Sequence, residues 1–382
     1  MTTYVKNSGS WVSISNIKAK NSGSWSQVNV TYLKSNGTWV PVWAPLPEAP
    51  VLTVTNTNAY TNSMTWTEPS SLLAITGYTL QKSTDNINWT DTGYTGTTRS
   101  FTITGLAENT THYYRVSAAN VYLSGPYSTT QMQTTRVATL KRSTFTSSGT
   151  WTKPIGVTSA ETLVCAGGGG GAASGYSIFT GFLTERTIYA GGGGGGGGVI
   201  IVTVTGLSSS QTDYTATVGS GGAAFSAGGN SSFLGYTATG GGRGSSGIFG
   251  AAGSGGSGGG GAGSTTWNGS AFSTSTTNGG ATVDANYGSA GSAGSAQGAF
   301  VYATGGFGGS GRSSTISGAL VNYANGGAGG VTAGSNGTNS TRGGGGPGGS
   351  IVAPNPITNV SSNASANGSA GNSGTVIVTW YD

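Results

Sequence analysis

Charged residues are scarce in this 382-residue chain, at 7% of the total, whereas about a quarter of a typical globular domain is charged. Its surface must therefore consist mostly of Ser, Thr, Asn and backbone groups. The net charge of +5 arises within the first 142 residues, which hold ten Lys and Arg against five Asp and Glu. Because these cations are scattered and form no basic stripe, we expect no nucleic-acid partner.

Cysteine and histidine occur once each, as Cys165 and His112. One cysteine excludes an internal disulfide framework. In the strand-like segment ETLVCA we interpret Cys165 as a buried thiol, with a reactive thiol as the alternative. A Cys/His metal site needs three or four ligands, so one chain cannot supply it. The ten carboxylates are dispersed; Glu161 and Glu185 come nearest to a pair in the C-terminal half, so a two-carboxylate hydrolase is not disproved. We expect no enzymatic activity and no cofactor.

Long apolar runs are also missing. No stretch approaches the roughly 20 residues that a membrane helix needs, so we expect no membrane insertion. The first ten residues, MTTYVKNSGS, lack the apolar core of a signal peptide. The sequence therefore predicts a protein that stays in a cytoplasm until something releases it.

A short repeat opens the chain. KNSGSW occupies residues 6–11 and 20–25, and KSNGTW occupies 34–39, a period of 14 residues. Each Asn/Ser/Gly turn lies between alternating apolar and polar residues, which predicts a β-hairpin. An isolated hairpin is marginal in water, so residues 1–43 form either a self-contained β-meander or a docking module. The docking candidates are Trp11, Trp25 and Trp39.

The middle segment, residues 47–136, consists of short alternating runs with turn signals about every ten residues, which predicts a seven-stranded β-sandwich. It resembles fibronectin type III domains, and the residues that carry the resemblance are Pro50, Trp66, Tyr78, Leu106 in ITGL, and YRVSAAN at 114–120. The resemblance implies a spacer or a weak surface contact. That family usually places a tyrosine-corner Tyr where this sequence has His112, which implies a hydrogen bond at a turn for this side chain.

The composition changes from residue 143, since only eight of the 74 glycines precede residue 149. Ordering glycine costs much backbone entropy, so a flexible low-complexity tail is one alternative. However, strand-like segments frame the glycines, and the closing GTVIVTWYD would aggregate if it stayed unpaired. We therefore predict that the two ends of residues 143–382 meet in one sheet.

Some of these glycines keep a period of three, most clearly at every third position from 241 to 259. Three residues per turn is the geometry of the polyproline-II helix. Collagen needs abundant proline, but only Pro347 lies between Pro154 and Pro354. We predict packed polyglycine-II helices whose bare backbones exchange N–H···O and Cα–H···O bonds, with the 241–259 run spanning about 56 Å. The expected fold class is all-β: tandem hairpins, a sandwich, and a glycine-rich β domain with packed polyglycine-II helices.

The framing segments FTSSGTWTKP, GVIIVTVTGL and YTATVG and the terminal GTVIVTWYD resemble the glycine-rich domain of bacteriophage tail fibres and tail-associated proteins. The hexamers resemble K-x-x-G-x-W repeats at the start of phage virion proteins. This resemblance implies a virion component, assembled in the host cytoplasm and released by lysis. Its N-terminal repeats would bind other virion proteins, and its loops would bind a host cell-surface glycan or protein. Since trimers are common among fibres, we expect a homo-oligomer, although no heptad signal marks one.

Aromatic residues lie between the glycine runs, among Asn, Ser and Thr. Rigid aromatics on adaptable polar loops are also how antibody paratopes make contact. Each could instead pack between glycine helices, so both roles stay open. The receptor-contact candidates are Phe249, Trp267, Phe272, Tyr287, Tyr302 and Tyr323, with Trp267 and Tyr287 placed first.

The leading hypothesis is a non-enzymatic tail fibre or tail-tip component that contributes to host attachment. One alternative is a capsid decoration protein or head fibre with the same anchor and no specific receptor. Another is a bacterial surface or ice-binding protein, because flat sheets of polyglycine helices can order water. The missing signal peptide counts against that last alternative.

Overall fold

The computed structural model describes residues 3–7, 10–14, 18–21, 24–27, 31–35, 38–43, 46–180, 184–210, 212–246, 250–268, 271–283, 288–297, 302–330, 364–366 and 368–382. Throughout these ranges the regular elements are β-strands, and none is a helix. The predicted all-β class is therefore confirmed. The chain divides into two compact units, residues 1–139 with Asp382 and residues 140–381.

Each N-terminal repeat forms its own antiparallel hairpin, as predicted. The pairs are β1 (Thr3–Asn7) with β2 (Ser10–Ile14), β3 (Lys18–Asn21) with β4 (Ser24–Gln27), and β5 (Thr31–Ser35) with β6 (Thr38–Trp43). The registers place a Trp opposite a Lys in every hairpin, namely Lys6↔Trp11, Lys20↔Trp25 and Lys34↔Trp39. Within the described part of these repeats, no strand of one hairpin pairs with a strand of another.

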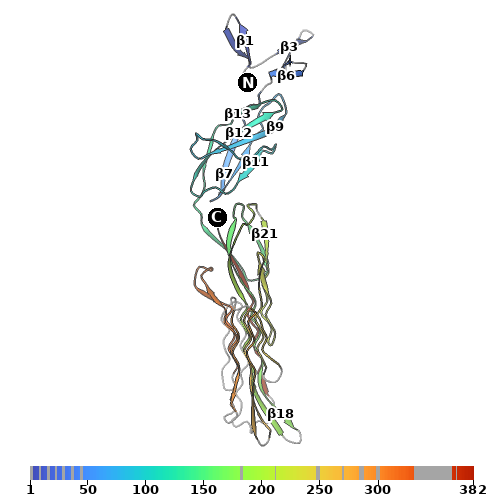
Figure 1. Cartoon of the computed structure of the whole chain (residues 1–382), viewed down its shortest axis with the longest axis vertical. Coiled ribbons are helices and arrows are strands. Elements are labelled where there is room, and N and C mark those ends of the chain that lie inside the picture. Colours follow the sequence, from blue (N-terminus) through green and yellow to red (C-terminus); the bar gives the residue numbers. More distant parts are fainter. Residues whose placement is uncertain are drawn as a thin grey trace. The chain divides into compact units, whose positions relative to one another are not determined.

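The following segment is a β-sandwich (Figure 1). One sheet has the order β11-β8-β7, from Ser100–Ile103, Thr61–Trp66 and Leu52–Asn58. The other has the order β10-β9-β12-β13, with β14 also paired to β12. Its strands are β9 (Ile75–Ser83), β10 (Thr90–Asp91), β12 (Thr111–Asn120), β13 (Ser124–Tyr127) and β14 (Gln131–Thr134). Strand alternation buries one face of each sheet, and the core includes Leu52, Met64, Trp66, Leu80 and Tyr114. The predicted sandwich is confirmed, although these two sheets hold eight strands and not the expected seven.

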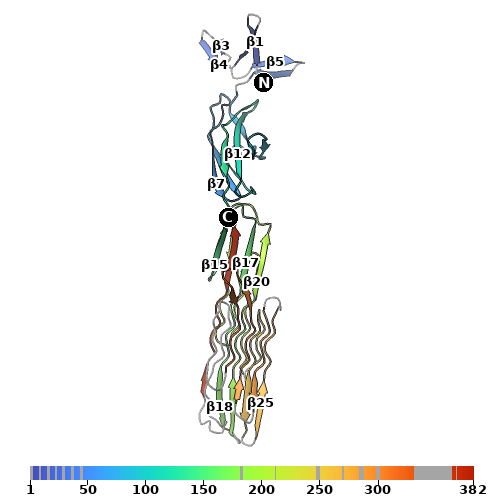
Figure 2. The ribbon, with the colours of Figure 1, turned by 90° about the vertical axis from the view of Figure 1, so that its left-hand side faces the viewer.

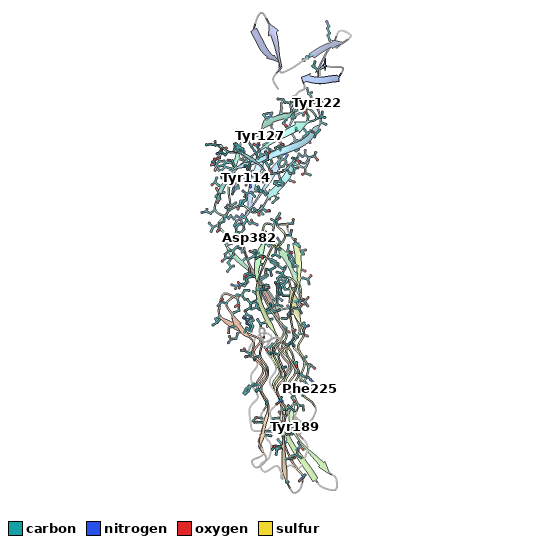
Figure 3. The ribbon with its side chains drawn as sticks, in the orientation of Figure 1. Tyr114, Tyr122, Tyr127, Tyr189, Phe225 and Asp382 are labelled. Carbon is teal, nitrogen blue, oxygen red and sulfur yellow. The ribbon has the colours of Figure 1, made fainter. Side chains whose placement is uncertain are left out.

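The implied turn position of His112 is wrong. His112 lies inside β12, opposite Gln133 of β14, and its side chain is 6% exposed. No described residue forms a hydrogen bond with its Nε2. The fully buried tyrosine is Tyr114, whose hydroxyl accepts a hydrogen bond from Asn62 Nδ2 at 3.0 Å (Figure 3). Because side chains two apart on a strand share a face, His112 and Tyr114 both point into the core.

The glycine-rich unit closes on itself, as predicted. Its first strand, β15 (Leu140–Phe145), pairs with its last, β31 (Thr375–Tyr381). Together with β17 (Ser159–Cys165) and β20 (Val199–Thr205) they form a sheet in the order β15-β31-β17-β20, which we call the base sheet.

One face of the base sheet is covered, and the other is covered in part. On one face lie β16 (Gly149–Lys153), β21 (Thr212–Ala216), β22 (Ser231–Phe233) and β23 (Tyr236–Ala238). They enclose a core cluster that includes Trp151, Phe233 and Val376. On the other face the hairpin of β28 (Arg312–Ser314) and β29 (Val321–Tyr323) packs Ile316 and Tyr323 against Leu163 and Ile377.

A second sheet, which we call the tip sheet, lies at the opposite end of this unit (Figure 2). Its order is β25-β24-β19-β18-β30, from Phe272–Thr276, Gly263–Trp267, Thr184–Ala190, Ser174–Thr180 and Ala364–Ala366. The hairpin of β26 (Ser295–Gln297) and β27 (Tyr302–Thr304) lies against it. Glycine segments run between the two sheets, so the unit has two β ends and a glycine middle.

The glycine segments are joined by backbone hydrogen bonds that repeat every third residue. In segment 166–173 the amides of Ala166, Gly169 and Ala172 donate to one neighbour, at the carbonyls of Gly198, Gly195 and Gly192. The intervening amides donate to two further neighbours, from Gly167 and Gly170 to Gly229 and Ser226, and from Gly168 and Gly171 to Asn372 and Ser369. A repeat of three neighbours in turn is the signature of a threefold helix, so the predicted packing of polyglycine-II helices is confirmed.

Close approach of the backbones explains why glycine fills the middle of this array. A Cβ built on Gly195 would overlap the carbonyl of Ser257, and one on Gly196 would overlap the carbonyl of Ala324. Both obstacles are backbone atoms, and the carbonyl of Ser257 is itself held by a hydrogen bond from the amide of Gly242. Neither can move aside as a flexible side chain would, so only glycine fits there.

The predicted single helix of about 56 Å over residues 241–259 is wrong. Gly253 donates to the carbonyl of Arg243 at 2.9 Å, and Gly259 donates to the carbonyl of Gly253 at 3.0 Å. The run therefore folds back on itself twice, with Gly250 at φ 132° in the first reversal. The period of three determines the neighbouring segment to which each residue bonds. The length of one helical segment is limited instead by the distance between the two sheets.

Candidate functional site

The hairpin tips of the glycine-rich unit gather three of the predicted aromatic candidates. Trp267 and Phe272 form the last pair of β24–β25 before its turn. Tyr302 pairs with Gln297 at the tip of β26–β27. Since β27 lies against β19 and β24 of the tip sheet, all three positions belong to the same end of the unit.

One register row crosses four strands of the tip sheet. Ile178 of β18 lies opposite Arg186 of β19, Arg186 lies opposite Trp267, and Trp267 lies opposite Phe272. Residues directly opposite on adjacent strands occupy the same face of a sheet. The row thus places one cationic and two aromatic positions on one face beside the turns.

Tyr323 is not a receptor contact. Its side chain is 2% exposed and packs with Leu163, Ile316 and Ile377 against the base sheet. Its glycine-flanked sequence resembles that of the other candidates. What distinguishes Tyr323 from them is its packing against the base sheet. Phe249 and Tyr287 lie outside the described residues.

The docking candidates are placed by backbone register alone. Trp11, Trp25 and Trp39 occupy equivalent positions, each opposite the Lys five residues before it. Equivalent positions in separate hairpins give three similar units rather than one continuous sheet. Their role in docking stays a prediction.

The thiol and carboxyl groups considered as reactive in the sequence do not come together in one site. Cys165 is fully buried on β17, and burial raises the pKa of its thiol to about 12. Because the thiolate is the nucleophile, this confirms the buried strand thiol and removes the reactive alternative. Glu161 lies on β17 of the base sheet, whereas Glu185 lies on β19 of the tip sheet, so the two do not pair. Across the described ranges, no group of three His, Cys, Asp or Glu could hold a metal ion.

A groove on the base sheet escaped the sequence analysis. It has a volume of about 530 Å³ and lies between the base sheet and the loop of the β28–β29 hairpin. Two of its residues are charged, Arg142 on β15 and Glu161 on β17. They are 19 residues apart in sequence, and β31, the last strand of the chain, separates them in the sheet. Only the strand order brings them to one site.

These features define a modular all-β chain, with a sandwich followed by a glycine array between two sheets. The chain belongs to the glycine-rich domain family, whose sequence profile matches residues 143–381. A fibronectin type III domain is also found, over residues 47–134. No segment of the described chain forms an apolar helix of membrane-spanning length.

Solved structures similar to part of this chain include two human domains. A fibronectin type III domain of the human KIAA0970 protein is 22% identical, with 24% of this chain and 76% of that chain covered and a TM-score of 0.22. The sixth such domain of human fibronectin type III domain containing protein 3 is 27% identical, with 25% and 92% covered and a TM-score of 0.24. No curated protein matches the chain.

Proposed function

We propose that this protein is a non-enzymatic component of a bacteriophage virion, a tail fibre or tail-tip protein that contributes to host-surface attachment. The observation that carries the proposal is the tip sheet, where a rigid glycine array holds aromatic positions beside hairpin turns. Trp267 and Phe272 end one hairpin, and Tyr302 ends the next.

Rigidity is the physical contribution of the array. Its segments exchange backbone hydrogen bonds with several neighbours at once, so the strands that carry the tips have little freedom left. Binding by groups that are already fixed loses less entropy than binding by flexible ones. Loops mounted on a fixed scaffold can also change in sequence without cost to the fold. Both properties suit a surface that must recognise a host glycan or protein.

The N-terminal hairpins supply the other function that an attachment protein needs. Three equivalent Trp positions, each opposite a Lys, give a repeated surface for other virion proteins. In this proposal the protein is a homo-oligomer in the virion, assembled in the host cytoplasm and released by lysis. The buried thiol of Cys165 and the separation of Glu161 from Glu185 support a role without catalysis.

The test first locates the protein on the particle and then measures whether the purified chain inhibits phage adsorption. Gold-labelled antibody against residues 143–382 should mark the tail tip or fibres of intact particles in electron micrographs. Purified chain should then reduce phage adsorption, and a Trp267→Ser/Phe272→Ser variant should lose that inhibition. The matched control is Tyr236→Ser, since Tyr236 is an exposed aromatic on β23, which packs over the base sheet at the other end of the unit.

Each other outcome has a definite meaning. Label over the head would replace this proposal with a capsid decoration protein or head fibre. Particles without label would remove every virion role. Equal inhibition by the double variant would leave the virion assignment in place but exclude the tip aromatics as the contact.

A further inference from the structure

The groove on the base sheet has a polar floor formed by one register row. Arg142 of β15 lies opposite Thr379 of β31, Thr379 lies opposite Glu161 of β17, and Glu161 lies opposite Thr203 of β20. All four residues line the groove. The loop of the β28–β29 hairpin forms its wall, and this hairpin is the orange one at the side of the unit in Figure 1.

Arg142 is fixed against that wall. Its Nη1 donates a hydrogen bond to the carbonyl of Ser317. Gly318 adopts φ +90°, and a Cβ at this position would lie 2.8 Å from Arg142 Nη2. The missing side chain therefore makes room for the guanidinium. Within the described chain, its remaining N–H groups have no acceptor, so Arg142 offers oriented donors.

Glu161 supplies the opposite chemistry from across the floor. Its strand is the second from that of Arg142, which puts the two backbones roughly 10 Å apart at the usual strand spacing. Glu161 and Arg142 form no ion pair; among the described residues the ion pair is that of Arg99 with Glu68. Glu161 is exposed, and no described side chain donates to its carboxylate. The groove thus has a fixed donor on one side and an open acceptor on the other.

The rim of the groove is apolar. Leu140 pairs with Tyr381, two residues along each strand from the Arg142↔Thr379 pair. Both side chains therefore lie on the same face of the base sheet as Arg142 and Thr379. Their side chains are 55% and 57% exposed. An exposed aromatic ring beside oriented donors and acceptors suits a molecule with apolar ring faces and a polar edge.

We infer that this groove binds a neutral hexose unit of a carbohydrate. Hydroxyls on opposite sides of the sugar ring accept from Arg142 and donate to Glu161, and a C–H face of the ring packs on Tyr381. The volume of about 530 Å³ lies within the range of small-molecule sites, roughly 300–1,000 Å³. The opposite charges of Arg142 and Glu161 favour a neutral ligand, because an anion would meet the carboxylate and a cation the guanidinium.

The site is independent of the tip sheet, so it adds a carbohydrate contact to the proposed function and can exist without it. The experiment titrates the full-length chain calorimetrically with maltose, lactose, α-mannobiose and N,N′-diacetylchitobiose, and with glucuronate and glucose 6-phosphate as charged probes. At least one neutral disaccharide should bind. Glu161→Gln and Arg142→Lys should each weaken it at least about tenfold, the loss of one hydrogen bond to a charged group.

The matched controls are Asp213→Asn, an exposed acid on β21, and Arg99→Lys, whose guanidinium pairs with Glu68 in the sandwich. Both should leave affinity unchanged. Thr203→Phe should block the groove sterically and abolish binding, at an exposed strand position that tolerates an aromatic side chain. The Trp267→Ser/Phe272→Ser variant should bind normally, which separates this site from the tip.

Three results would overturn the inference. The first is that no neutral disaccharide binds, and the second is that Glu161→Gln and Arg142→Lys both leave the affinity unchanged. The third is that a charged probe binds more tightly than every neutral one. Melting temperatures of the variants close to that of the original chain would exclude misfolding as the cause of lost binding.

Discussion

The ring centroids of Trp151 and Trp380 lie 5.3 Å apart at an interplanar angle of 52°. Trp151 comes from the second strand of the glycine-rich unit and Trp380 from its last. Phe233 also contacts Trp151, edge to face at 5.8 Å. The beginning and end of this unit are therefore joined by side-chain packing as well as by the β15–β31 ladder.

We expect Trp151→Ala to lower the free energy of unfolding of the glycine-rich unit by about 3–5 kcal/mol, as for other buried Trp truncations. Trp151→Phe should cost less, because the indole Nε1 has no partner among the described residues and its loss removes an unsatisfied donor. Differential scanning calorimetry of the full chain measures both, with the exposed Tyr236→Ala as control. Equal losses at positions 151 and 236 would contradict the packing argument.

Central glycines should be intolerant of even a methyl group. Gly195→Ala places a Cβ against the carbonyl of Ser257, and overpacking against backbone costs about 1–3 kcal/mol or more. Ser254→Ala adds no atom, and its position is exposed. We expect Gly195→Ala to lower the calorimetric midpoint of the glycine-rich unit by several degrees and Ser254→Ala to leave it in place. An unchanged midpoint in Gly195→Ala would argue against close backbone packing.

The stability of the sandwich should fall in mild acid because of His112. Burial, with a smaller contribution from Lys82, lowers the pKa of His112 below 6.5. Between the lowered pKa and 6.5 the unfolded chain binds the proton more readily than the folded one, so stability decreases as the pH falls through this window. Below the lowered pKa both states are protonated, and this dependence levels off.

Urea midpoints of the sandwich transition between pH 7.5 and 5 measure the effect. His112→Phe keeps an aromatic ring in β12 and removes the titration, so its midpoint should vary less across this range. The same slope in both proteins would assign the pH dependence to other groups. Asp85 is not one of them, because hydrogen bonds from the amides of Asn88 and Ile87 hold the pKa of its carboxyl below its ordinary value of 3.8.

Most of the fold could be predicted from local patterns, because hairpin turns and alternating strands depend on neighbouring residues. Repeated turns predicted the N-terminal hairpins, and the apolar GTVIVTWYD predicted a strand that needs a partner. Segment length could not be predicted in this way. The first fold-back, at Gly250, depends on the distance between the two sheets, which no stretch of the glycine run encodes.

The sites were less predictable than the strands because they depend on contacts between segments that are distant in the sequence. Tyr323 and Trp267 both stand in aromatic, glycine-flanked segments, yet Tyr323 packs on the base sheet while Trp267 ends a hairpin. The pairing of Arg142 and Glu161 in one groove depends on the last strand, β31, inserting between two earlier ones. Such long-range order follows from the closure of the unit and not from local sequence.

Arg115 holds together the outer face of the sandwich and gives the last prediction. Its guanidinium carbon lies 4.1 Å from the ring centroid of Trp89 and 4.3 Å from that of Tyr127. Its Nε donates to Gln81 Oε1 at 2.9 Å. A planar guanidinium can stack between two rings, whereas the compact ammonium of lysine cannot.

Arg115→Lys should therefore lower the free energy of unfolding of the sandwich by about 1–2 kcal/mol, the scale of partly desolvated cation–π contacts. Arg99→Lys is the matched control, since Arg99 contacts Glu68 at 2.9 Å in an exposed ion pair and such pairs contribute at most about 1 kcal/mol. Urea unfolding at low and high salt separates the two cases. Salt screens the exposed pair but leaves the stacked guanidinium largely unaffected, so the loss in Arg115→Lys should persist at high salt. A loss that disappears with salt would mean that Arg115 acts only through its charge.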